Sequence, residues 1–403
     1  MLTLDPIQTL AAGGLCLLAG YAIRRRLPQL ARFNIPASVI GGLLVAVALL
    51  ACRHWDAAPV QFDTTLERPL MIAFFTSIGF NASVSLLRIS GRQVALFLGL
   101  ATFLAVVQNV VGIGLAKAFG LSPLFGVVAG SATLTGGPAT GLAFAPLFEQ
   151  AGVVGAKSIA LASAMAGIVI GSIVGAPLAT MLIERRKLAQ AGSAAASGAA
   201  SHAPAAAAAS SARSADEHLP HGLKSLVLLL VAMGLGAWVS DGLHALELTM
   251  PSYIGAMLVG AVIRNIDDHF GWFGLSVTSI DAIGSICLSL FLAVALMDLH
   301  LWELAGLATP LLVNLGVQTV IVAAFCCWPL LQLMGRDYDA AVMAGGFAGF
   351  MLGITANAMA VMDSLTERFG PAPRAFLVAP LVGAFLIDFT NAIVITFFIN
   401  AWK

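Results

Sequence analysis

Apolar runs long enough to cross a lipid bilayer recur along this chain from residue 7 almost to its end. A helix of about 20 apolar residues spans the roughly 30 Å of hydrocarbon in a bilayer. Ten runs near this length are present, at about 7–23, 35–52, 69–87, 93–116, 158–183, 223–240, 249–263, 277–297, 304–334 and 375–399. Hydrophobic residues make up 59% of the 403 and charged residues only 10%, unlike a soluble domain. The sequence therefore predicts an all-α polytopic membrane protein.

Two charge-free segments rich in Gly and Thr interrupt this pattern, at 130–141 (GSATLTGGPATG) and 345–357 (GGFAGFMLGITAN). Gly weakens a helix by about 1 kcal/mol relative to Ala, so the segments predict broken backbone. At membrane depth such backbone is tolerated only where it is buried in protein or lines a polar cavity. We expect a re-entrant hairpin at about 122–148 and another at 338–366, which together form a candidate substrate site. The alternative is that the small residues only let helices pack closely.

The basic residues predict how the chain is oriented. Clusters of Arg and Lys follow the first span at 24–26 and the fifth at 185–187. If the N-terminus is outside and each Gly-rich segment re-emerges on its own side, fifteen of the twenty Lys and Arg face the cytoplasm. The five that face outward are Arg53, Arg68, Lys117, Lys157 and Lys403. The positive-inside rule therefore predicts that both termini lie on the periplasmic side.

The chain divides into two similar halves. Residues 189–217 form a low-complexity Ala/Ser stretch, which predicts a flexible cytoplasmic linker over 189–221. A shift of 215 residues aligns Pro36 with Pro251, Gly120 with Gly335, Gly130 with Gly345 and Thr140 with Thr355. Each half, 1–188 and 222–403, contains five spans and one hairpin in the same order. Because an odd number of spans inserts the second half upside down, we expect inverted repeats of the kind that secondary transporters use.

The hairpin tips supply the candidate binding groups. Half-helix starts present N–H groups that suit a carboxylate, and carbonyl and hydroxyl oxygens suit Na⁺. The candidates for the substrate are Thr135, Gly136, Gly137, Thr140, Gly141, Gly353, Thr355 and Asn357. Ser131 and Thr133 join Asn81, Asp388 and Asn391 as candidates for Na⁺. No Arg or Lys lies inside either predicted hairpin, which favours an anion neutralised by helix ends and co-bound cations.

Polar residues within apolar spans are costly unless they are satisfied or functional. Asp388 and Asn391 lie three apart in the last span and so share a helical face. Asp388 is the carboxylate that we place deep inside a span; it can ligate Na⁺, carry a proton or fix a neighbouring helix. The lone amides Gln108, Asn109, Asn314 and Gln318 are read first as interhelical hydrogen-bonding groups, and Asn81 as the best exception.

Several chemistries lack their sequence signatures. There is no GxxxxGK[ST] phosphate loop and no HExxH or CxxCH motif. The five cysteines lack metal-site spacing and are interpreted as small apolar residues. We therefore expect no enzyme activity, no cofactor apart from Na⁺ as coupling ion, and no nucleic-acid partner.

At the hairpins and the last span, the sequence resembles the bacterial sodium/glutamate symporter family. The similar segments occur in order: DPIQTL, NIPASVIGGLL, AFFTSIGFNAS, VVQNVVGIGLA, GVVAGSATLTGG and LVAPLVGAFLIDFTNAIVI. The resemblance implies a multi-pass inner-membrane protein with two inverted five-span halves. It also implies Na⁺-coupled uptake of L-glutamate through an elevator-like movement of a hairpin-bearing domain against a dimeric scaffold.

The resemblance carries over to particular residues. Gly136, Gly137, Thr140 and Gly141 match the first hairpin motif, Gly353 and Thr355 match the second, and Asn81, Asp388 and Asn391 match polar positions. The chain departs from the family pattern at Pro138 and Ala139, and has ITANA at the second tip instead of a Pro-containing sequence. Two other functions stay open: a proton-coupled carrier of another small dicarboxylate or amino acid, and a passive channel. An intramembrane enzyme is a more distant alternative.

Overall fold

The computed structural model of this chain describes residues 2–27, 30, 33, 35–54, 60–188, 221–245, 250–304 and 306–402. The described residues are helical apart from two short strands, β1 (Leu2–Leu4) and β2 (Val60–Phe62). The strands pair in parallel with Leu2 opposite Val60 and Leu4 opposite Phe62. Three residues are too few to show a strand period, so the sequence did not predict this sheet. The predicted linker lies outside the described residues except for 221.

The helices of the first half follow the predicted order. They are α1 (Pro6–Arg26), α3 (Ala37–His54), α4 (Glu67–Phe80), α5 (Val84–Ala118), α6 (Pro123–Val127), the π-helical turn η1 (Val128–Ala132), α7 (Gly137–Gln150) and α8 (Ala156–Arg185). Asp5 caps α1 by accepting a hydrogen bond from Gln8 N at 2.8 Å. The Arg residues in the last turn complement the negative end of the helix dipole.

The described residues of the second half form helices and connecting turns. It contains α9 (His221–Ala245), α10 (Tyr253–Phe270), α11 (Val277–Met297), the short η3 (Leu301–Leu304), α12 (Ala308–Phe325), η4 (Cys326–Leu330), α13 (Leu331–Leu333), α14 (Tyr338–Met351), α15 (Thr355–Phe369), α16 (Pro373–Leu381), η5 (Val382–Leu386) and α17 (Ile387–Ala401). The π-helical segment η4 contains Pro329, and η5 starts two residues after Pro380; each proline removes a helical N–H donor.

Among the described residues, six helices are long and apolar enough to cross a membrane. They cover Pro6–Arg26, Gly91–Ala118, Ala156–Arg185, Gly222–Leu243, Val277–Met297 and Ala308–Leu333, and coincide with six of the ten predicted spans. The other four predicted spans are helical but shorter or less apolar. One of them was placed wrongly, because 69–87 is not one helix: α4 ends at Phe80 and α5 starts at Val84. The intervening Asn81–Ser83 stretch makes turn-type hydrogen bonds.

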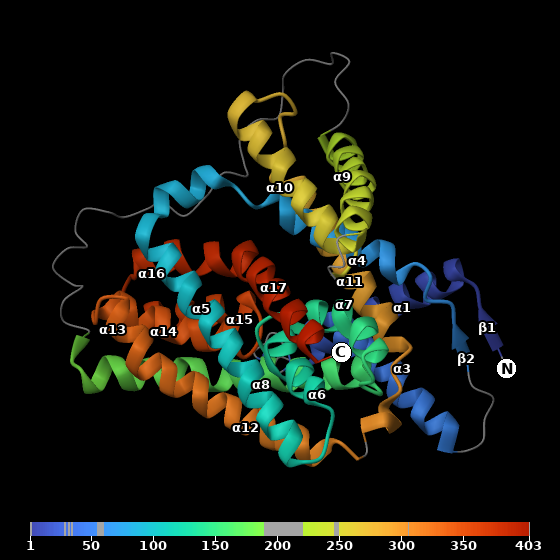
Figure 1. Ribbon diagram of the computed structural model, residues 1–403, viewed down its shortest axis with the longest axis horizontal. Helices are drawn as coiled ribbons and strands as arrows, with labels where there is room; N and C mark the ends of the chain where they lie inside the picture. Colours follow the sequence, from blue (N-terminus) through green and yellow to red (C-terminus); the bar gives the residue numbers. More distant parts are fainter. Residues whose placement is uncertain are drawn as a thin grey trace.

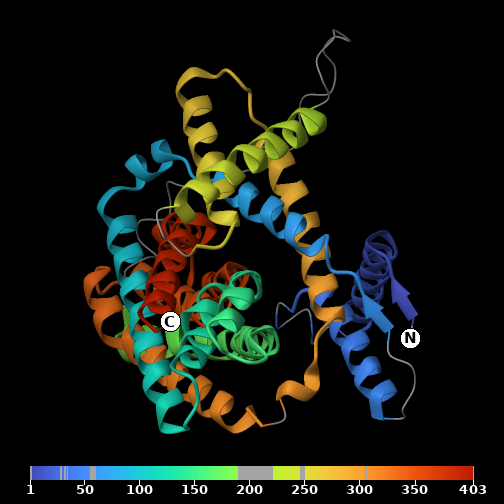
Figure 2. The same ribbon diagram turned by 45° about the vertical axis from the view of Figure 1, so that its right-hand side comes forward.

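The helices form two groups (Figures 1 and 2). The scaffold group consists of α1, α3, α4, α9, α10 and α11. The hairpin group consists of α5–α8 and α12–α17. Within the scaffold group α3 packs against α1 and α11, while α10 packs against α9 and α4. Contacts between the groups are fewer and include α7 with α11, α5 with α10, and η5 with α4.

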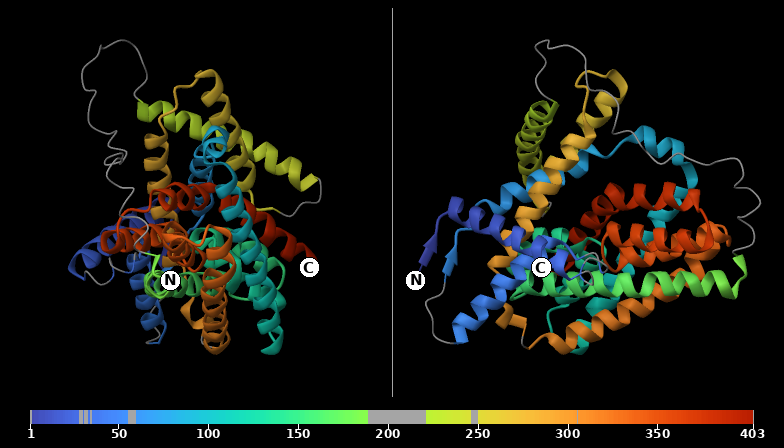
Figure 3. Two further views of the ribbon diagram at one scale, coloured as in Figure 1. Left: turned by 90° about the vertical axis from the view of Figure 1, so that its left-hand side faces the viewer. Right: turned by 180° about the vertical axis from the view of Figure 1, so that it is seen from behind.

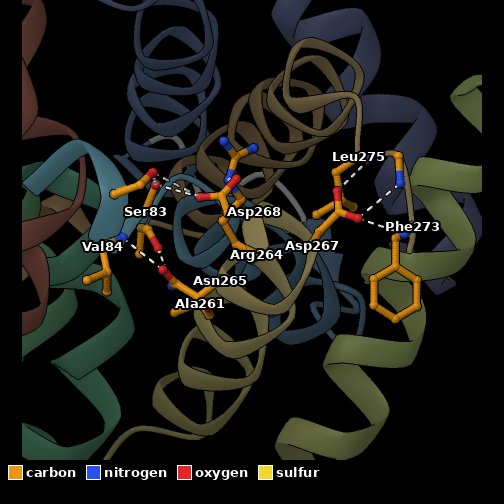
Figure 4. A network of polar contacts seen from close by, with 12 residues as sticks. Ser83, Val84, Ala261, Arg264, Asn265, Asp267, Asp268, Phe273 and Leu275 are labelled. Atoms are coloured by element: carbon orange, nitrogen blue, oxygen red, sulfur yellow. Dashed lines mark hydrogen bonds and ion pairs between the residues drawn. The ribbon is translucent and has the colours of Figure 1, made fainter. Parts of the chain in front are cut away.

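A polar network ties the connection between α4 and α5 to the end of α10 (Figure 4). Asn265 accepts from Val84 N at 2.8 Å and donates to Ala82 O at 2.7 Å. Asp268 accepts from Ser83 Oγ and pairs with Arg264 at 3.0 Å. These side chains satisfy backbone groups that the helix break would otherwise leave without partners, which makes the break part of the fold.

In the hairpin group, α8 lies alongside α14 and α15 (Figure 3). Glycines allow this close approach: a Cβ on Gly175 would lie 2.9 Å from Gly345 O, and one on Gly171 would lie 3.1 Å from Gly349 O. Gly345 and Gly349 are inside regular helix α14, so the second Gly-rich segment breaks only at its C-terminal end. Close packing, the alternative interpretation of the small residues, therefore accounts for this part of the segment.

Candidate functional site

The first hairpin is broken in two places. Gly130 has non-helical backbone (φ −103°, ψ −128°) inside η1, and the chain leaves the helix again at Thr135 and Gly136 before α7 starts at Gly137. Gly137 has φ +67°, a conformation that side chains with a Cβ rarely adopt. Pro138 then occupies the first turn of α7, where its missing N–H costs no helical hydrogen bond. The Gly-rich sequence thus turns the chain from one arm of the hairpin into the other.

The second hairpin has one break. Its first arm α14 is capped by Asp337, which accepts from Ala340 N at 2.9 Å, and ends at Met351. Residues 352–354 leave the helix, and α15 starts at Thr355 after the extended residue Ile354. The arms α14 and α15 pack against each other. Each Gly-rich segment therefore contains a helix end followed by a new helix start, as the sequence predicted.

The tips of the two hairpins meet. A Cβ on Gly137 would lie 2.9 Å from Ile354 Cγ2 and 3.7 Å from Gly353 O. The N-terminus of α7 and the N-terminus of α15 therefore lie at one junction, although they are more than 200 residues apart in sequence. Each helix N-terminus carries about half a positive charge and unpaired N–H groups. Two such ends at one junction favour an anionic ligand.

The predicted substrate residues surround this junction. Thr135, Gly137, Thr140, Gly141, Gly353 and Asn357 are buried, while Gly136 and Thr355 are half-buried. Thr355 donates to Gly383 O at 2.8 Å, and Asn357 donates to Ile168 O at 2.8 Å. The Oδ1 atom of Asn357 is buried and has no hydrogen-bond partner among the described residues. Gly141 lets α7 approach Thr133 closely, since a Cβ at Gly141 would lie 2.7 Å from Thr133 Cγ2.

Amides from three helices hold the backbone of η1. Asn109 of α5 accepts from Ser131 N at 2.9 Å, and Asn391 of α17 donates to Ser131 O at 2.9 Å. Asn314 of α12 donates to Ala129 O at 2.6 Å. Ser131 Oγ, Asn391 Oδ1 and Asn109 Nδ2 are buried with no hydrogen-bond partner in the described part of the chain. Because buried polar atoms normally have partners, this cluster indicates a site for an ion or small ligand.

The other predicted cation residues are placed differently. Thr133 is buried nearby and donates to Val128 O at 2.7 Å, with Ser163 Oγ 2.9 Å away. Asp388 lies one turn before Asn391 in α17 and is half-buried. Asn81 is not brought to this cluster. It ends α4 and donates to Asp281 Oδ1 at 2.7 Å and to Ser77 O at 3.3 Å.

Several polar residues near the site were not among the predicted ligands. Gln108, Asn109, Asn314 and Gln318 were interpreted as interhelical amides, and all four are buried and hydrogen-bonded to backbone of other elements. Asp281 is a second carboxylate within a predicted span that the sequence analysis overlooked. In the sequence, Asp281 could have been found as a single acidic residue near the start of an apolar run. Tyr253 could not, because no motif or charge in the surrounding sequence distinguishes it.

A charged cavity lies at the other end of α7. It has a volume of 570 Å³ and is lined by both helix groups, including Leu142, Pro146 and Leu147 of α7 and Met71 of α4. Lys157 of α8 crosses it: its Nζ lies 3.1 Å from Glu67 Oε2 and 3.7 Å from Asp298 Oδ2. This ion pair joins the first turn of α8 to the start of α4 and the end of α11, and so links the hairpin group to the scaffold group.

The sequence matches characterised proteins along most of its length. A family model described as sodium/glutamate symporter matches residues 2–371. The sodium/glutamate symporter of Haemophilus influenzae is 39% identical over 399 residues, which cover 97% of this chain and 96% of that protein. The sodium/glutamate symporter of Escherichia coli K12 is 40% identical over 400 residues, which cover 99% and 98%. No solved structure matches the chain. With its membrane-compatible helices and paired hairpins, this chain belongs to the sodium/glutamate symporter family.

Proposed function

We propose that this protein is a secondary active transporter that carries L-glutamate into the cell together with Na⁺. The observation that carries the proposal is the meeting of two helix N-termini at Gly137 and Ile354. No side-chain cation lies in either tip, 133–137 or 352–355, so the helix ends and a co-bound cation must balance the charge of an anion. The names of the relatives in Haemophilus influenzae and Escherichia coli support glutamate and Na⁺ as the pair.

Glutamate binds, in this proposal, at the junction of the tips. The backbone of Gly136, Gly137 and Gly353 approaches the ligand closely because no Cβ intervenes. Thr135, Thr140, Gly141, Thr355 and Asn357 complete the site. The half-buried Gly136 and Thr355 and the exposed Ala356 mark the side from which the ligand enters. The Asn357 amide oxygen, buried and without a partner in the described structure, accepts from the ammonium group of the substrate.

Na⁺ binds beside Ser131. Oxygen atoms are the ligands of hard cations, and Ser131 Oγ and Asn391 Oδ1 are two buried oxygens that lack partners among the described residues. The hydrogen bond from Asn391 Nδ2 to Ser131 O holds them close together. Thr133 lies within the same segment, and Asp388 supplies negative charge one turn away. Asn81, the other predicted Na⁺ residue, lies apart from this cluster, with its Nδ2 atom donating to Asp281.

The architecture that we propose is two inverted repeats, 1–188 and 222–403, joined by the linker 189–221. The matched packing of α3 with α1 and α11, and of α10 with α9 and α4, supports it. Each repeat holds five membrane spans and one re-entrant hairpin, at 122–148 and 338–366. Both termini lie on the periplasmic side of a bacterial inner membrane and the linker in the cytoplasm, as the distribution of Lys and Arg favours.

Transport proceeds, we propose, by an elevator-like movement of the hairpin group against the scaffold group, with the scaffold forming a homodimer. The limited set of contacts between the two groups favours movement of one against the other as a rigid body. The Lys157 bridge to Glu67 and Asp298 is one contact that such a movement must break.

Uptake by proteoliposomes tests the function directly. Labelled glutamate should accumulate above its external concentration under an inward Na⁺ gradient, and a Na⁺ ionophore should abolish the accumulation. Uptake that saturates but ignores the Na⁺ gradient contradicts Na⁺ coupling. Flux that never exceeds the external concentration and does not saturate identifies a passive channel instead.

Proton coupling is the second candidate, because Asp388 is a half-buried carboxyl group one turn before Asn391 in α17 and a carboxyl group can exchange a proton. In that case Asp388→Asn should remove the dependence of uptake on pH and leave uptake insensitive to Na⁺. Under the Na⁺-coupled proposal, the same substitution should instead weaken the dependence on Na⁺ concentration. The two outcomes separate the candidates.

A further inference from the structure

Gln108 of α5 connects the two hairpin tips. It is fully buried, with 0% of its surface exposed. Its Oε1 atom accepts from the Thr135 hydroxyl at 2.7 Å, and its Nε2 atom donates to Met351 O at 3.0 Å. Thr135 belongs to the first tip, and Met351 is the last residue of α14 before the second tip. Gln108 thus hydrogen-bonds both hairpins, beside a direct contact between them in which Thr135 Oγ1 lies 3.8 Å from Met351 Sδ.

The donors and acceptors in this bridge allow one orientation of the amide. Met351 O can only accept, so the NH₂ group of Gln108 must face it. The Gln108 oxygen therefore faces Thr135, whose hydroxyl must donate. The oxygen of Thr135 then remains as an acceptor. Gln318 holds Gln108 further by donating to its backbone oxygen at 2.8 Å.

A continuous chain of hydrogen bonds runs from the cation cluster to the second tip. Ser131 O accepts from Asn391 Nδ2 and from the backbone N atoms of Thr135, at 3.3 Å, and Gly136, at 3.0 Å. Thr135 then donates to Gln108, and Gln108 donates to Met351 O. If Ser131 shifts when a cation binds, the first group of this hydrogen-bond chain moves. The last group, Met351 O, lies beside the second tip, where we propose that the substrate binds.

We propose that Gln108 is a positioning residue that couples the two ligands, and so sets how strongly Na⁺ raises the affinity for glutamate. This inference rests on the proposed function. It assigns no ligand contact to Gln108, which acts through Thr135 and Met351. Coupling between two binding sites is reciprocal and commonly changes affinity by about 5- to 150-fold, so the loss of one bridging side chain should give a measurable change.

The test measures the coupling factor, the ratio of the glutamate Kd without Na⁺ to that with saturating Na⁺, on the purified full chain by isothermal titration calorimetry. Gln108→Leu keeps the volume and loses both hydrogen bonds, and we expect its coupling factor to be about tenfold smaller than that of the wild type. Thr319→Val removes a hydroxyl of α12 that donates to Leu315 O of its own helix, and should keep the wild-type coupling factor.

A purely structural role for Gln108 predicts a different pattern. Gln108→Glu, when ionised, accepts from Thr135 but cannot donate to Met351 O; its protonated form does both. Its coupling factor should therefore recover as the pH falls, which a general loss of stability does not produce. If Gln108→Leu does not fold, Gln108→Asn, too short to reach both partners, replaces it.

Two results overturn the proposal and are distinguishable. A wild-type coupling factor of one contradicts the proposed Na⁺-coupled function, and this inference with it. Strong coupling in the wild type that persists in Gln108→Leu or Gln108→Asn contradicts only the role of Gln108.

Discussion

Substitution of Gly137 by Ala tests whether the meeting of the tips forms the substrate site. The new Cβ would lie 2.9 Å from Ile354 Cγ2, so the Ile354 side chain, or the second tip that carries it, must move by about 1 Å to restore an ordinary contact. A misplacement of about 1 Å can cost on the order of 100-fold at a preorganised site. We expect glutamate affinity in saturating Na⁺ to fall by about 10- to 100-fold, or about 1.4 to 2.7 kcal/mol.

The positive φ of Gly137 means that Gly137→Ala also strains the backbone, so a control variant must carry the same strain. Ala at φ +67° is strained by about 1–2 kcal/mol. Gly120 offers a matched position, because it has φ +69° and an added Cβ there meets nothing within 4 Å. Gly120→Ala should therefore lower the unfolding temperature by a similar amount without touching the tips.

Titration of glutamate by calorimetry, together with thermal unfolding, separates the two costs. Both variants should unfold a few degrees below the wild type, and only Gly137→Ala should lose affinity. If Gly137→Ala binds glutamate as tightly as Gly120→Ala, the junction at Ile354 does not form the binding site and the reasoning fails.

Three further outcomes are expected. Ser131→Ala removes a buried hydroxyl that has no partner in the described structure, so the unfolding temperature without Na⁺ should stay nearly unchanged. The rise in unfolding temperature that Na⁺ produces should be smaller in this variant than in the wild type. Ser163→Ala, which removes a hydroxyl next to Thr133, should keep the wild-type rise. Lys157→Met removes the ion pair with Glu67, whose two side chains are 23% and 19% exposed, and should lower the free energy of unfolding by about 1 kcal/mol or less. This loss of stability relative to the wild type should be smaller in 0.5 M salt, because salt screens ion pairs. A loss of the same size in 0.5 M salt would contradict an ionic origin. Asp267, beyond the predicted span 249–263, is subject to burial that raises its pKa, but hydrogen bonds from Leu275, Phe273 and Gly274 N, with Arg264, outweigh this and lower the pKa below 3.8. The ionised Asp267 carboxylate therefore stabilises the fold above the pKa that it has in the unfolded chain, and this stabilisation is lost as the pH falls through its pKa in the folded protein. The difference in unfolding temperature between the wild type and Asp267→Asn should narrow below about pH 4. A difference that stays constant with pH would contradict a stabilising role of the ionised carboxylate.

The sequence predicted those parts of the fold that depend on local composition. Runs of apolar residues fixed where most helices lie, because backbone in lipid must satisfy its own hydrogen bonds. Glycines predicted where helices break, and the breaks lie at Gly130, at 135–136 and at 352–354. The break at 81–83 was missed, since its pairing with Asn265 and Asp268 comes from residues about 180 positions away.

The candidate site shows the same division. Gly and Thr residues near the tips were identifiable from composition, and Asp388 and Asn391 from the cost of polar groups in an apolar span. Asn81 met the same criterion but bonds to Asp281, and Gln108 met it without indicating that it joins both tips. A polar residue in an apolar run shows that a partner is needed and does not identify the partner.

By itself, then, the sequence determined that the chain is a helical membrane protein, and it predicted two Gly-rich helix breaks with no Arg or Lys in them. The tertiary structure decided that Gly137 meets Ile354, that Asn391 reaches Ser131, and that Gln108 bridges Thr135 and Met351. The physical reason is the range of the interactions. Helix formation, helix breaking and burial in lipid act over a few neighbouring residues, whereas these contacts join elements between 27 and 260 positions apart and exist only after the helices have packed.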